Sequence, residues 1–381
     1  MRRIFGLGLL LSISSVCSTA KAARDEVVSI AVADEHSCAL KRSGQVSCWG
    51  RNSAGQLGDG TRVDRSTPAP VLGLAGVAQL ASFGSRTCAT RRDGSVWCWG
   101  NTDGLLPAGD ATVPRRLETV NDVAEIAIGG EHACARSRTG TVRCWGRNEH
   151  GQLGDGSKHA RPTPVEVVGV NDAVGVALGT SHSCALLADH TVRCWGANEG
   201  GQLGDSTLSD RTKPSSISDF GGVAQLVASG ASTCARLVNG TVRCWGWNSD
   251  GQLGDGTRRN HPLPMAVHGL EAIAEIALGA TSACARRIDG SVACWGERKA
   301  LDGDDIIDTR SLVPVPVVGL THALVLGRMG HVARGHECVL DVNQVRCWGE
   351  NTFGQLGDNK AGGHQPTAVA LPDPPHWPAS R

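Results

Sequence analysis

The sequence predicts an all-β protein, a seven-bladed β-propeller built from repeats of about fifty residues, with one cross-strand disulfide per blade. Three observations indicate this fold class. Glycine accounts for 50 of 381 residues, and Val, Thr and Gly dominate the patterned segments, which is typical of short strands joined by tight turns. Fourteen cysteines form seven regularly spaced pairs. A Trp-Gly dipeptide follows the second cysteine of every pair.

The first 22 residues have the pattern of a signal peptide. Arg2 and Arg3 precede the apolar stretch Ile4 to Val16, and Ala20-Lys21-Ala22 offers a cleavage site, so the mature chain is expected to start near Ala23. We therefore expect an exported protein, periplasmic, cell-surface or extracellular, with no membrane span. Lipoprotein anchoring at Cys17 is a minor alternative, because Val16 fits the preceding position poorly. Cleavage would remove Cys17 and leave an even number of cysteines, as export favours.

The cysteine pairs predict hairpins whose register can be counted. Six pairs have the spacing C-x9-C, and most enclose a glycine turn signal. In the second unit, a three-residue loop ending at Gly94 places Arg91 opposite Ser95. Counting outward from that pair places Cys88 opposite Cys98, at a non-hydrogen-bonded site where facing side chains come closest. The spacing therefore predicts a disulfide across the hairpin.

The seventh unit tests this count, because its spacing is C-x8-C and its loop has lost the glycine. A two-residue loop, Val342-Asn343, again places the two cysteines opposite each other. Zinc is disfavoured, because no unit has a C-x2-C pair or a histidine at short spacing from both cysteines. The predicted disulfides join Cys38 to Cys48, Cys88 to Cys98, Cys134 to Cys144, Cys184 to Cys194, Cys234 to Cys244, Cys284 to Cys294, and Cys338 to Cys347.

The tryptophan after each second cysteine points to the opposite sheet face, because neighbouring residues on a strand alternate. Both faces must then be buried, as they are when a blade is packed between two others. We interpret the seven tryptophans as packing between blades rather than a ring that stacks on ligands, a reading that the absence of tyrosine supports. They are Trp49, Trp99, Trp145, Trp195, Trp245, Trp295 and Trp348.

Five units continue with the sequence Gly-Gln-Leu-Gly-Asp, at 55–59, 151–155, 201–205, 251–255 and 354–358. Turn geometry explains these glycines better than a phosphate cradle, because no G-x-x-x-x-G-K-[ST] motif and no following helix are present. A Pro-x-x-Val strand follows, for example at Pro68 to Val71, and proline places it at a sheet edge.

The string Cys-Ala-Leu, Gly-x-Val, Cys-Trp-Gly-x-Asn-x-x-Gly-Gln-Leu-Gly-Asp-Gly-Thr and Pro-x-x-Val resembles the regulator of chromosome condensation repeat. The likeness runs from Val27 to about Leu371, and it implies a propeller domain over 23–372 with a short C-terminal tail over 373–381. It leaves open whether the last strand, Thr367 to Leu371, completes the first blade; the absence of a proline-started strand before Val27 favours that closure.

Function does not follow from this fold alone. The family's nuclear founding member is an exchange factor for a small GTPase, an activity that we do not expect in an exported, disulfide-linked chain. With 37 basic and 37 acidic residues and no charge block, the chain shows no nucleic-acid stripe. We expect a monomeric binding scaffold, without a cofactor, for an unknown protein or surface polymer. The alternatives are a propeller-based hydrolase or lyase, or an enzyme inhibitor, as in secreted propellers that inhibit β-lactamase.

Departures from the repeat indicate where a partner could bind, since repeated residues are already explained by packing. Arg147, His150, Trp247 and Phe353 are the candidate binding-face residues, with the exposed aromatics as anchors. Two units have lost the loop motif, at Asn101 to Asp110 and Leu301 to Asp308. We interpret the acidic run from Asp302 to Asp308 as a solvated loop, because it lacks EF-hand spacing for calcium.

Four units have a histidine two residues before the first cysteine: His36, His132, His182 and His336. A metal site would need three or four ligands within one coordination sphere, whereas separate blades spread these side chains apart. We therefore expect each histidine to form a hydrogen bond within its own turn.

Overall fold

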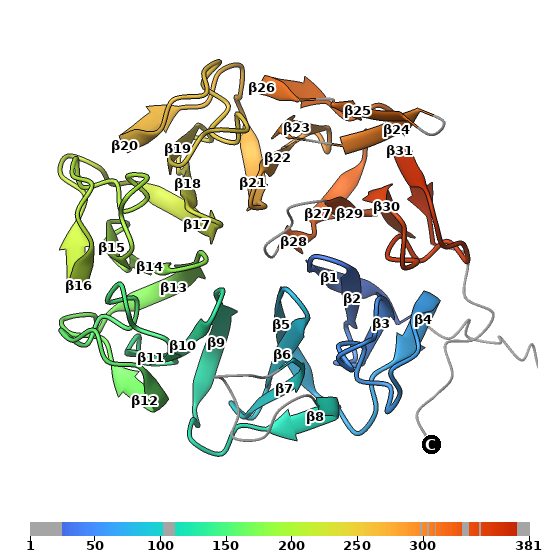
Figure 1. The fold of residues 1–381 in the computed structure, drawn as a ribbon, viewed down its shortest axis with the longest axis horizontal. Coiled ribbons are helices and arrows are strands. Elements are labelled where there is room, and N and C mark those ends of the chain that lie inside the picture. The colour runs from blue at the N-terminus through green and yellow to red at the C-terminus, as the bar shows by residue number, and fades with distance from the viewer. Residues whose placement is uncertain are drawn as a thin grey trace, which may run out of the picture.

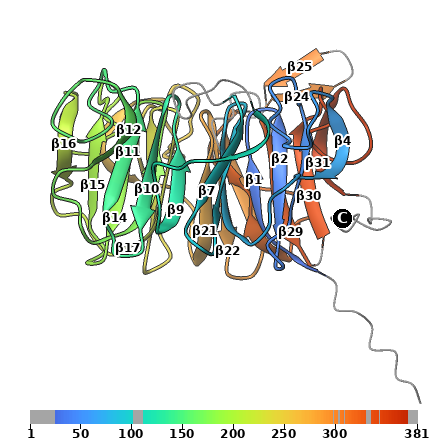
Figure 2. The same cartoon turned by 90° about the horizontal axis from the view of Figure 1, so that it is seen from below.

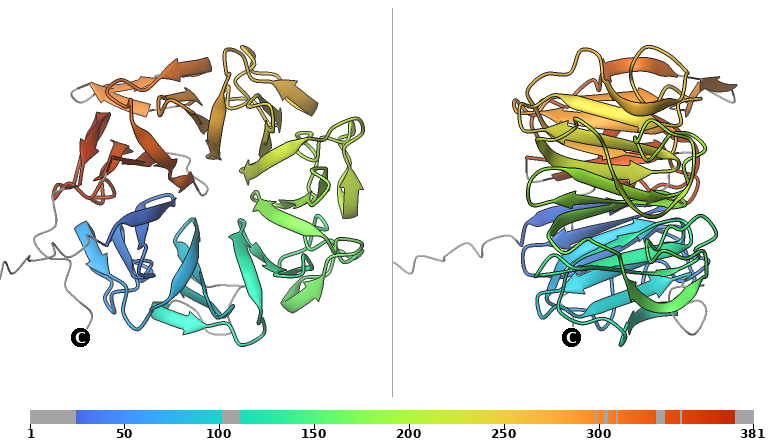
Figure 3. Two further views of the ribbon diagram at one scale, coloured as in Figure 1. Left: turned by 180° about the vertical axis from the view of Figure 1, so that it is seen from behind. Right: turned by 90° about the vertical axis from the view of Figure 1, so that its left-hand side faces the viewer.

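The computed structural model describes residues 25–101, 111–297, 299–302, 305–308, 310–329, 335–342 and 344–371. These residues form seven antiparallel four-stranded blades around a central axis, as the sequence predicts (Figure 1). Seen from the side, the ring is a short cylinder with loops at both ends (Figures 2 and 3). The predicted signal peptide, Cys17 and the C-terminal tail lie outside the described residues. Among those that are described, no helix has the length and apolar character that a membrane crossing needs.

Each blade uses four strands in chain order, with the first strand innermost. Blade 1 comprises β1 (Val27–Val32), β2 (His36–Lys41), β3 (Val46–Gly50) and β4 (Arg65–Pro70). Blade 2 comprises β5 (Val77–Phe83), β6 (Arg86–Arg91), β7 (Val96–Gly100) and β8 (Ala111–Arg116). Blade 3 comprises β9 (Val123–Ile128), β10 (His132–Ser137), β11 (Val142–Gly146) and β12 (Arg161–Glu166). Blade 4 comprises β13 (Ala173–Leu178), β14 (His182–Leu187), β15 (Val192–Gly196) and β16 (Arg211–Ser216).

The remaining three blades repeat this arrangement. Blade 5 comprises β17 (Val223–Ser229), β18 (Ser232–Leu237), β19 (Val242–Gly246) and β20 (His261–Ala266). Blade 6 comprises β21 (Ile273–Leu278), β22 (Ser282–Arg287), β23 (Val292–Gly296) and β26 (Ser311–Pro316), with a small hairpin, β24 (Lys299–Asp302) and β25 (Asp305–Asp308), before its outer strand. Blade 7 comprises β27 (Ala323–Leu326), β29 (His336–Asp341), β30 (Gln344–Glu350) and β31 (His364–Ala370), and the short β28 (Arg328–Met329) follows β27.

The predicted hairpin register is confirmed. Arg91 donates its backbone N–H to the Ser95 carbonyl, and Cys88 lies opposite Cys98. In the shortened seventh hairpin, Asp341 faces Gln344 and the cysteines again face each other. Seven disulfides form as predicted, one between the second and third strands of each blade, with Cα–Cα separations of 4.0 to 4.1 Å. Such separations are typical of non-hydrogen-bonded antiparallel pairs.

The hydrophobic core lies between blades rather than within them. Each of seven buried clusters combines the disulfide of one blade with the tryptophan of the next, as in the cluster that joins Cys134 and Cys144 to Trp195. Cluster membership returns to the start of the chain, because Cys338 and Cys347 pack with Trp49. The prediction that cysteine and tryptophan occupy opposite, buried sheet faces is therefore confirmed.

Ring closure differs from the sequence expectation. The last strand, β31, pairs with β30 and completes blade 7, whereas β1 to β4 already complete blade 1. The expectation that Thr367 to Leu371 would complete the first blade is therefore wrong. Blades 7 and 1 meet through a short parallel pairing of β28 with β1, in which Arg328 lies opposite Ala31. A strand supplied from the far end of the chain is unnecessary, because β4 already forms the outer strand of blade 1.

Candidate binding face

The two ends of the ring carry different loops. The turns between first and second strands and the long loops between third and fourth strands share one end, which we call the loop face. Their backbones are tied together, since Arg147 N–H donates to the Glu131 carbonyl and Trp247 N–H to the Ala231 carbonyl, each at 2.9 Å. The hairpin tips and the connections between blades share the opposite end, the tip face, where Gly44 packs against Gly76. The side view separates the two ends (Figure 2).

Each complete long loop is organised around one buried asparagine. Asn198 accepts the Leu203 N–H at 3.0 Å and donates to the Asp205 carboxylate at 3.1 Å. Burial alone would raise the pKa of the Asp205 carboxyl, but hydrogen bonds from Thr207 and Arg211 outweigh it and hold that pKa below its usual value. Equivalent asparagines, Asn52, Asn148, Asn248 and Asn351, make the same two contacts in blades 1, 3, 5 and 7. The five complete long loops therefore share one hydrogen-bonded frame.

The Gly-Gln-Leu-Gly segment clasps the tryptophan of the next blade. Trp195 Nε1 donates to the Gln152 carbonyl at 2.9 Å, and the same bond joins Trp49 to Gln355, Trp99 to Gln56, Trp245 to Gln202 and Trp295 to Gln252. The second glycine packs closely against the indole, since a Cβ on Gly154 would lie 2.8 Å from Trp195 Nε1. Its φ of +69° also favours glycine, so the turn interpretation of these glycines is confirmed. Their larger role, which the sequence did not reveal, is contact between blades.

Blades 2 and 6 have lost this motif, and their neighbours show the consequence. Trp145 and Trp348 follow those two blades, and their indole N–H groups have no hydrogen-bond partner within the described part of the chain. Of blade 2, residues 102–110 lie outside it. In blade 6, Asp302 and Asp305–Asp308 lie in the paired strands β24 and β25 rather than in the expected loop. Residues 303–304 lie outside the described part of the chain, and the side chains of this segment are not described.

The four histidines contradict the expectation that each bonds within its own turn. Each ring extends toward the next blade, and its Nε2 contacts a serine or threonine hydroxyl on the second strand of that blade. The pairs are His36 with Thr87 at 2.8 Å, His132 with Ser183 at 2.9 Å, His182 with Thr233 at 2.9 Å, and His336 with Ser37 at 2.6 Å. Among the described residues, one group has metal-ligand spacing, Cys284, Cys294 and Glu337, and those two cysteines are joined in a disulfide.

The candidate binding residues all lie on the loop face, in blades 3, 5 and 7. Arg147 forms an ion pair with Glu131 at 2.5 Å, and its side chain is 59% exposed. His150 Nδ1 lies 2.9 Å from the Asp210 carboxylate of the next blade. Both side chains are accessible, but each already has a polar partner at the blade boundary.

The two aromatic anchors differ in their settings. Trp247 is 42% exposed, and its indole lies over Gly200 of the preceding blade, where a Cβ would come within 3.3 Å of the ring. Phe353 is half-buried, and the Arg51 guanidinium lies 4.8 Å from its ring centroid. Trp247 follows β19 of blade 5 and Phe353 follows β30 of blade 7, and blade 6 lies between those two blades (Figure 1). Sequence reasoning missed Arg51, although its position directly after Trp-Gly matches Arg147 and Trp247.

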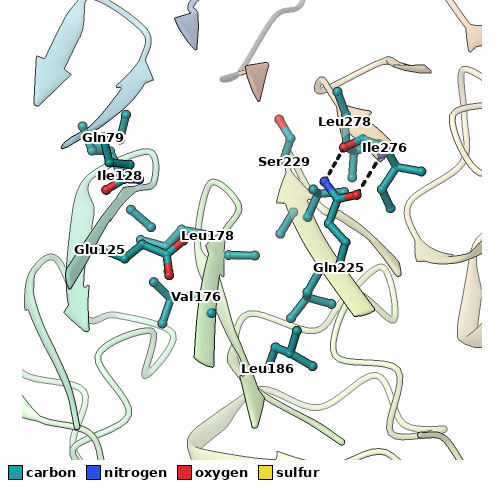
Figure 4. A pocket seen from close by; sticks show the side chains of 18 of the residues that line it. Gln79, Glu125, Ile128, Val176, Leu178, Leu186, Gln225, Ser229, Ile276 and Leu278 are labelled. Atoms are coloured by element: carbon teal, nitrogen blue, oxygen red, sulfur yellow. Dashed lines mark hydrogen bonds between the residues drawn. The ribbon is translucent and has the colours of Figure 1, made fainter. Parts of the chain in front are cut away.

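A central cavity of about 310 Å³ is lined by the inner strands β5, β9, β13, β17 and β21. Its amides are used to join blades: Gln225 donates to the Ile276 carbonyl at 2.8 Å and accepts its N–H at 2.9 Å (Figure 4). Gln79 makes the same two bonds to Ile126. Glu275 accepts the Leu326 N–H at 2.9 Å and pairs with Arg286 of its own blade. These polar groups hold the ring together.

The arrangement matches a known family and fold. A family model described as the RCC1-like domain matches residues 12–267. Human WBSCR16 aligns with a TM-score of 0.75 and 19% identity, over 87% of this chain and 95% of that one. Yeast RCC1 (Prp20), in a structure bound to Kap60, aligns with a TM-score of 0.73 and 17% identity, over 98% and 91%. The ectodomain of the Physcomitrella patens receptor kinase CR4 aligns with a TM-score of 0.55 and 21% identity, over 85% and 74%. The curated proteins contain no match.

Proposed function

The chain belongs to the RCC1-like domain family, and on this premise we propose that it is an exported, monomeric scaffold that binds a partner protein on its loop face. A binding role agrees with what is known of structural neighbours: yeast Prp20 has been studied in complex with Kap60 and for binding to Gsp1p and histones. Those partners belong to that protein, since identities of 17 to 19% support a shared fold alone. Exchange activity on a small GTPase is not part of the proposal.

Export is supported by the disulfides. One buried disulfide in each of seven blades suits an oxidising compartment, where such bonds persist. The net charge of zero argues against steering toward nucleic acid. A protein surface is then a more suitable partner than a polyanion.

The observation that carries the proposal is Trp247, a large aromatic side chain 42% exposed on a rigid frame. Tryptophan and arginine are the side chains most enriched at the energetic centres of interfaces, and a rigid support lowers the entropic cost of binding. The Arg51–Phe353 pair offers a second aromatic and cationic contact on the same face. The hydrogen bond from Trp247 Nε1 to Ser249, at 2.7 Å, holds the indole in place.

Affinity capture from the producing cells' periplasm or culture medium tests the proposal, with three immobilised forms of the chain. The double variant Trp247→Ala, Phe353→Ala alters the loop face, and Val238→Ala, Ile288→Ala alters residues 65% and 73% exposed on the tip face. A protein retained by the wild type and the tip-face variant but lost from the loop-face variant supports the proposal. Equal retention by all three forms would show that another surface binds, and no retained protein at all would count against protein binding.

A further inference from the structure

Four of the seven blade boundaries are joined by a buried histidine. His36, His132, His182 and His336 are 0% exposed, and each Nε2 contacts a hydroxyl of the following blade at 2.6 to 2.9 Å. The boundaries concerned lie between blades 1 and 2, 3 and 4, 4 and 5, and 7 and 1. We call them the histidine seams. In the other three blades the same position holds Arg86, Ser232 and Ser282.

The hydrogen-bond chain assigns the proton on these rings. Ser183 Oγ donates to the Gln152 carbonyl at 2.9 Å, and Thr233 Oγ1 donates to the Gln202 carbonyl at 3.0 Å. Each hydroxyl hydrogen is thus committed, so the hydroxyl oxygen accepts from the histidine. The neutral His132 and His182 rings therefore carry their proton on Nε2 and leave Nδ1 without one.

Nδ1 has no hydrogen-bond partner in any of the four rings, within the residues that the structure describes. In two seams a glycine makes room for the imidazole: a Cβ on Gly179 would lie 2.4 Å from His182 Nδ1, and one on Gly129 would lie 2.7 Å from His132 Nδ1. A second proton would consequently create a buried N–H without an acceptor and a buried positive charge. Both are costly in a folded protein.

The charges near these rings add to that cost. Groups that oppose a proton act on two of the rings: the Arg86 guanidinium and, once it is protonated, the His182 ring act on His132, and the His36 ring, once protonated, acts on His336. No salt bridge between these four rings and a carboxylate occurs in the described parts of the chain. For each ring, burial is the main cause that lowers the pKa from 6.5 to about 3.

We propose that the histidine seams are an acid-sensitive device, in which protonation of the four imidazoles parts the blades they join. The seams between blades 3 and 4 and between 4 and 5 are continuous, because Gly130 N–H donates to the Thr180 carbonyl and Thr180 N–H donates to Gly230. These turns lie on the loop face. Loss of the His132 and His182 contacts therefore loosens the loop face at three consecutive blades, and this holds whether or not a partner binds there.

The pH dependence of stability follows from the different proton affinities of the folded and the unfolded chain. The unfolded chain binds a proton on each histidine as the pH falls through 6.5, whereas the folded chain does not until about pH 3. Stability is therefore fully present above pH 6.5 and is lost as the pH falls below it. For each fall of one pH unit in this window, proton uptake by one histidine of the unfolded chain raises the unfolding equilibrium constant about tenfold. Together the four raise it by up to about four powers of ten per pH unit.

Denaturant unfolding of the full chain between pH 7.5 and 4.5, with disulfides intact, measures this slope. His182→Gln keeps a neutral donor but does not titrate, and it should lower the slope by about one power of ten per pH unit. The control is His268→Gln, since His268 is exposed on the tip face, and it should leave the slope unchanged. Equal slopes in the wild type and His182→Gln would overturn the proposal.

Two measurements on the wild type do not depend on whether a variant folds. By NMR, the His182 ring should stay neutral down to pH 4.5 while the fold is intact. Hydrogen exchange, corrected for the intrinsic effect of pH, should show the Gly130 and Thr180 amides losing protection at pH 4.5 relative to pH 7. Titration of His182 near pH 6.5 in the folded protein, or unchanged protection of both amides, would refute the device.

Discussion

Replacing tryptophan by phenylalanine at two equivalent positions should isolate the energy of one contact between blades. Trp195→Phe removes an indole N–H that donates to the Gln152 carbonyl at 2.9 Å, whereas Trp145→Phe removes one that has no partner among the described residues. Both indoles are at most 1% exposed, so the loss of ring volume is matched. The hydrogen bond should make Trp195→Phe the more destabilising change by about 1 kcal/mol. For a domain of this size, that is about 2 °C in melting temperature.

The comparison can be made by urea unfolding with disulfides intact, supported by calorimetry. Two further blade boundaries provide internal replicates, since Trp295→Phe should behave like Trp195→Phe, and Trp348→Phe like Trp145→Phe. Equal losses of unfolding free energy in the two classes, or a larger loss at Trp145, would refute the reasoning. Such a result would mean that the clasp by the Gly-Gln-Leu-Gly loop adds nothing to the packing of the ring.

Three further changes test other parts of the frame. Removing one disulfide with Cys184→Ala, Cys194→Ala should lower the free energy of unfolding by about 2 to 3 kcal/mol, because the bond closes a loop of 10 residues; a loss below about 0.5 kcal/mol in chemical denaturation would contradict this. Asn198→Ala should cost at least about 2 kcal/mol and speed hydrogen exchange at Leu203, because its amide organises the buried loop; an unchanged exchange rate would argue against that role. Gly204→Ala should lower the melting temperature, because a Cβ would lie 2.8 Å from an indole nitrogen at a φ of +71°; a stable variant would show that the loop can move aside.

The blade architecture could be predicted because its signals are local and occur seven times. Hairpin register depends on loop length alone, so counting from Arg91 and Ser95 was enough to place Cys88 opposite Cys98. Opposite placement of cysteine and tryptophan follows from strand alternation, and it gave the correct burial of Trp195.

Contacts between blades were predicted poorly, because they join residues about fifty positions apart through geometry that no single repeat contains. Nothing local shows that His182 reaches Thr233, or that the Gln152 carbonyl receives the indole of Trp195. Ring closure failed for the same reason, since the pairing of β28 with β1 depends on an irregular segment of blade 7. For the candidate site, the sequence placed four residues on one face, but it did not show that Trp247 lies against Gly200 or that Arg51 lies against Phe353.

Because every blade is completed by four strands from one continuous stretch of the chain, no sheet depends on a strand from the far end. The boundary between blades 7 and 1 carries the same indole and histidine contacts as the boundaries between blades 1 and 2, 3 and 4, and 4 and 5. The chain could then begin at any connection between blades without dividing a sheet, provided that the old ends were linked. Circular permutants opened at different connections should therefore fold to the same ring. For evolution, the same modularity means that a whole repeat, with its disulfide, can be gained, lost or exchanged as one heritable unit.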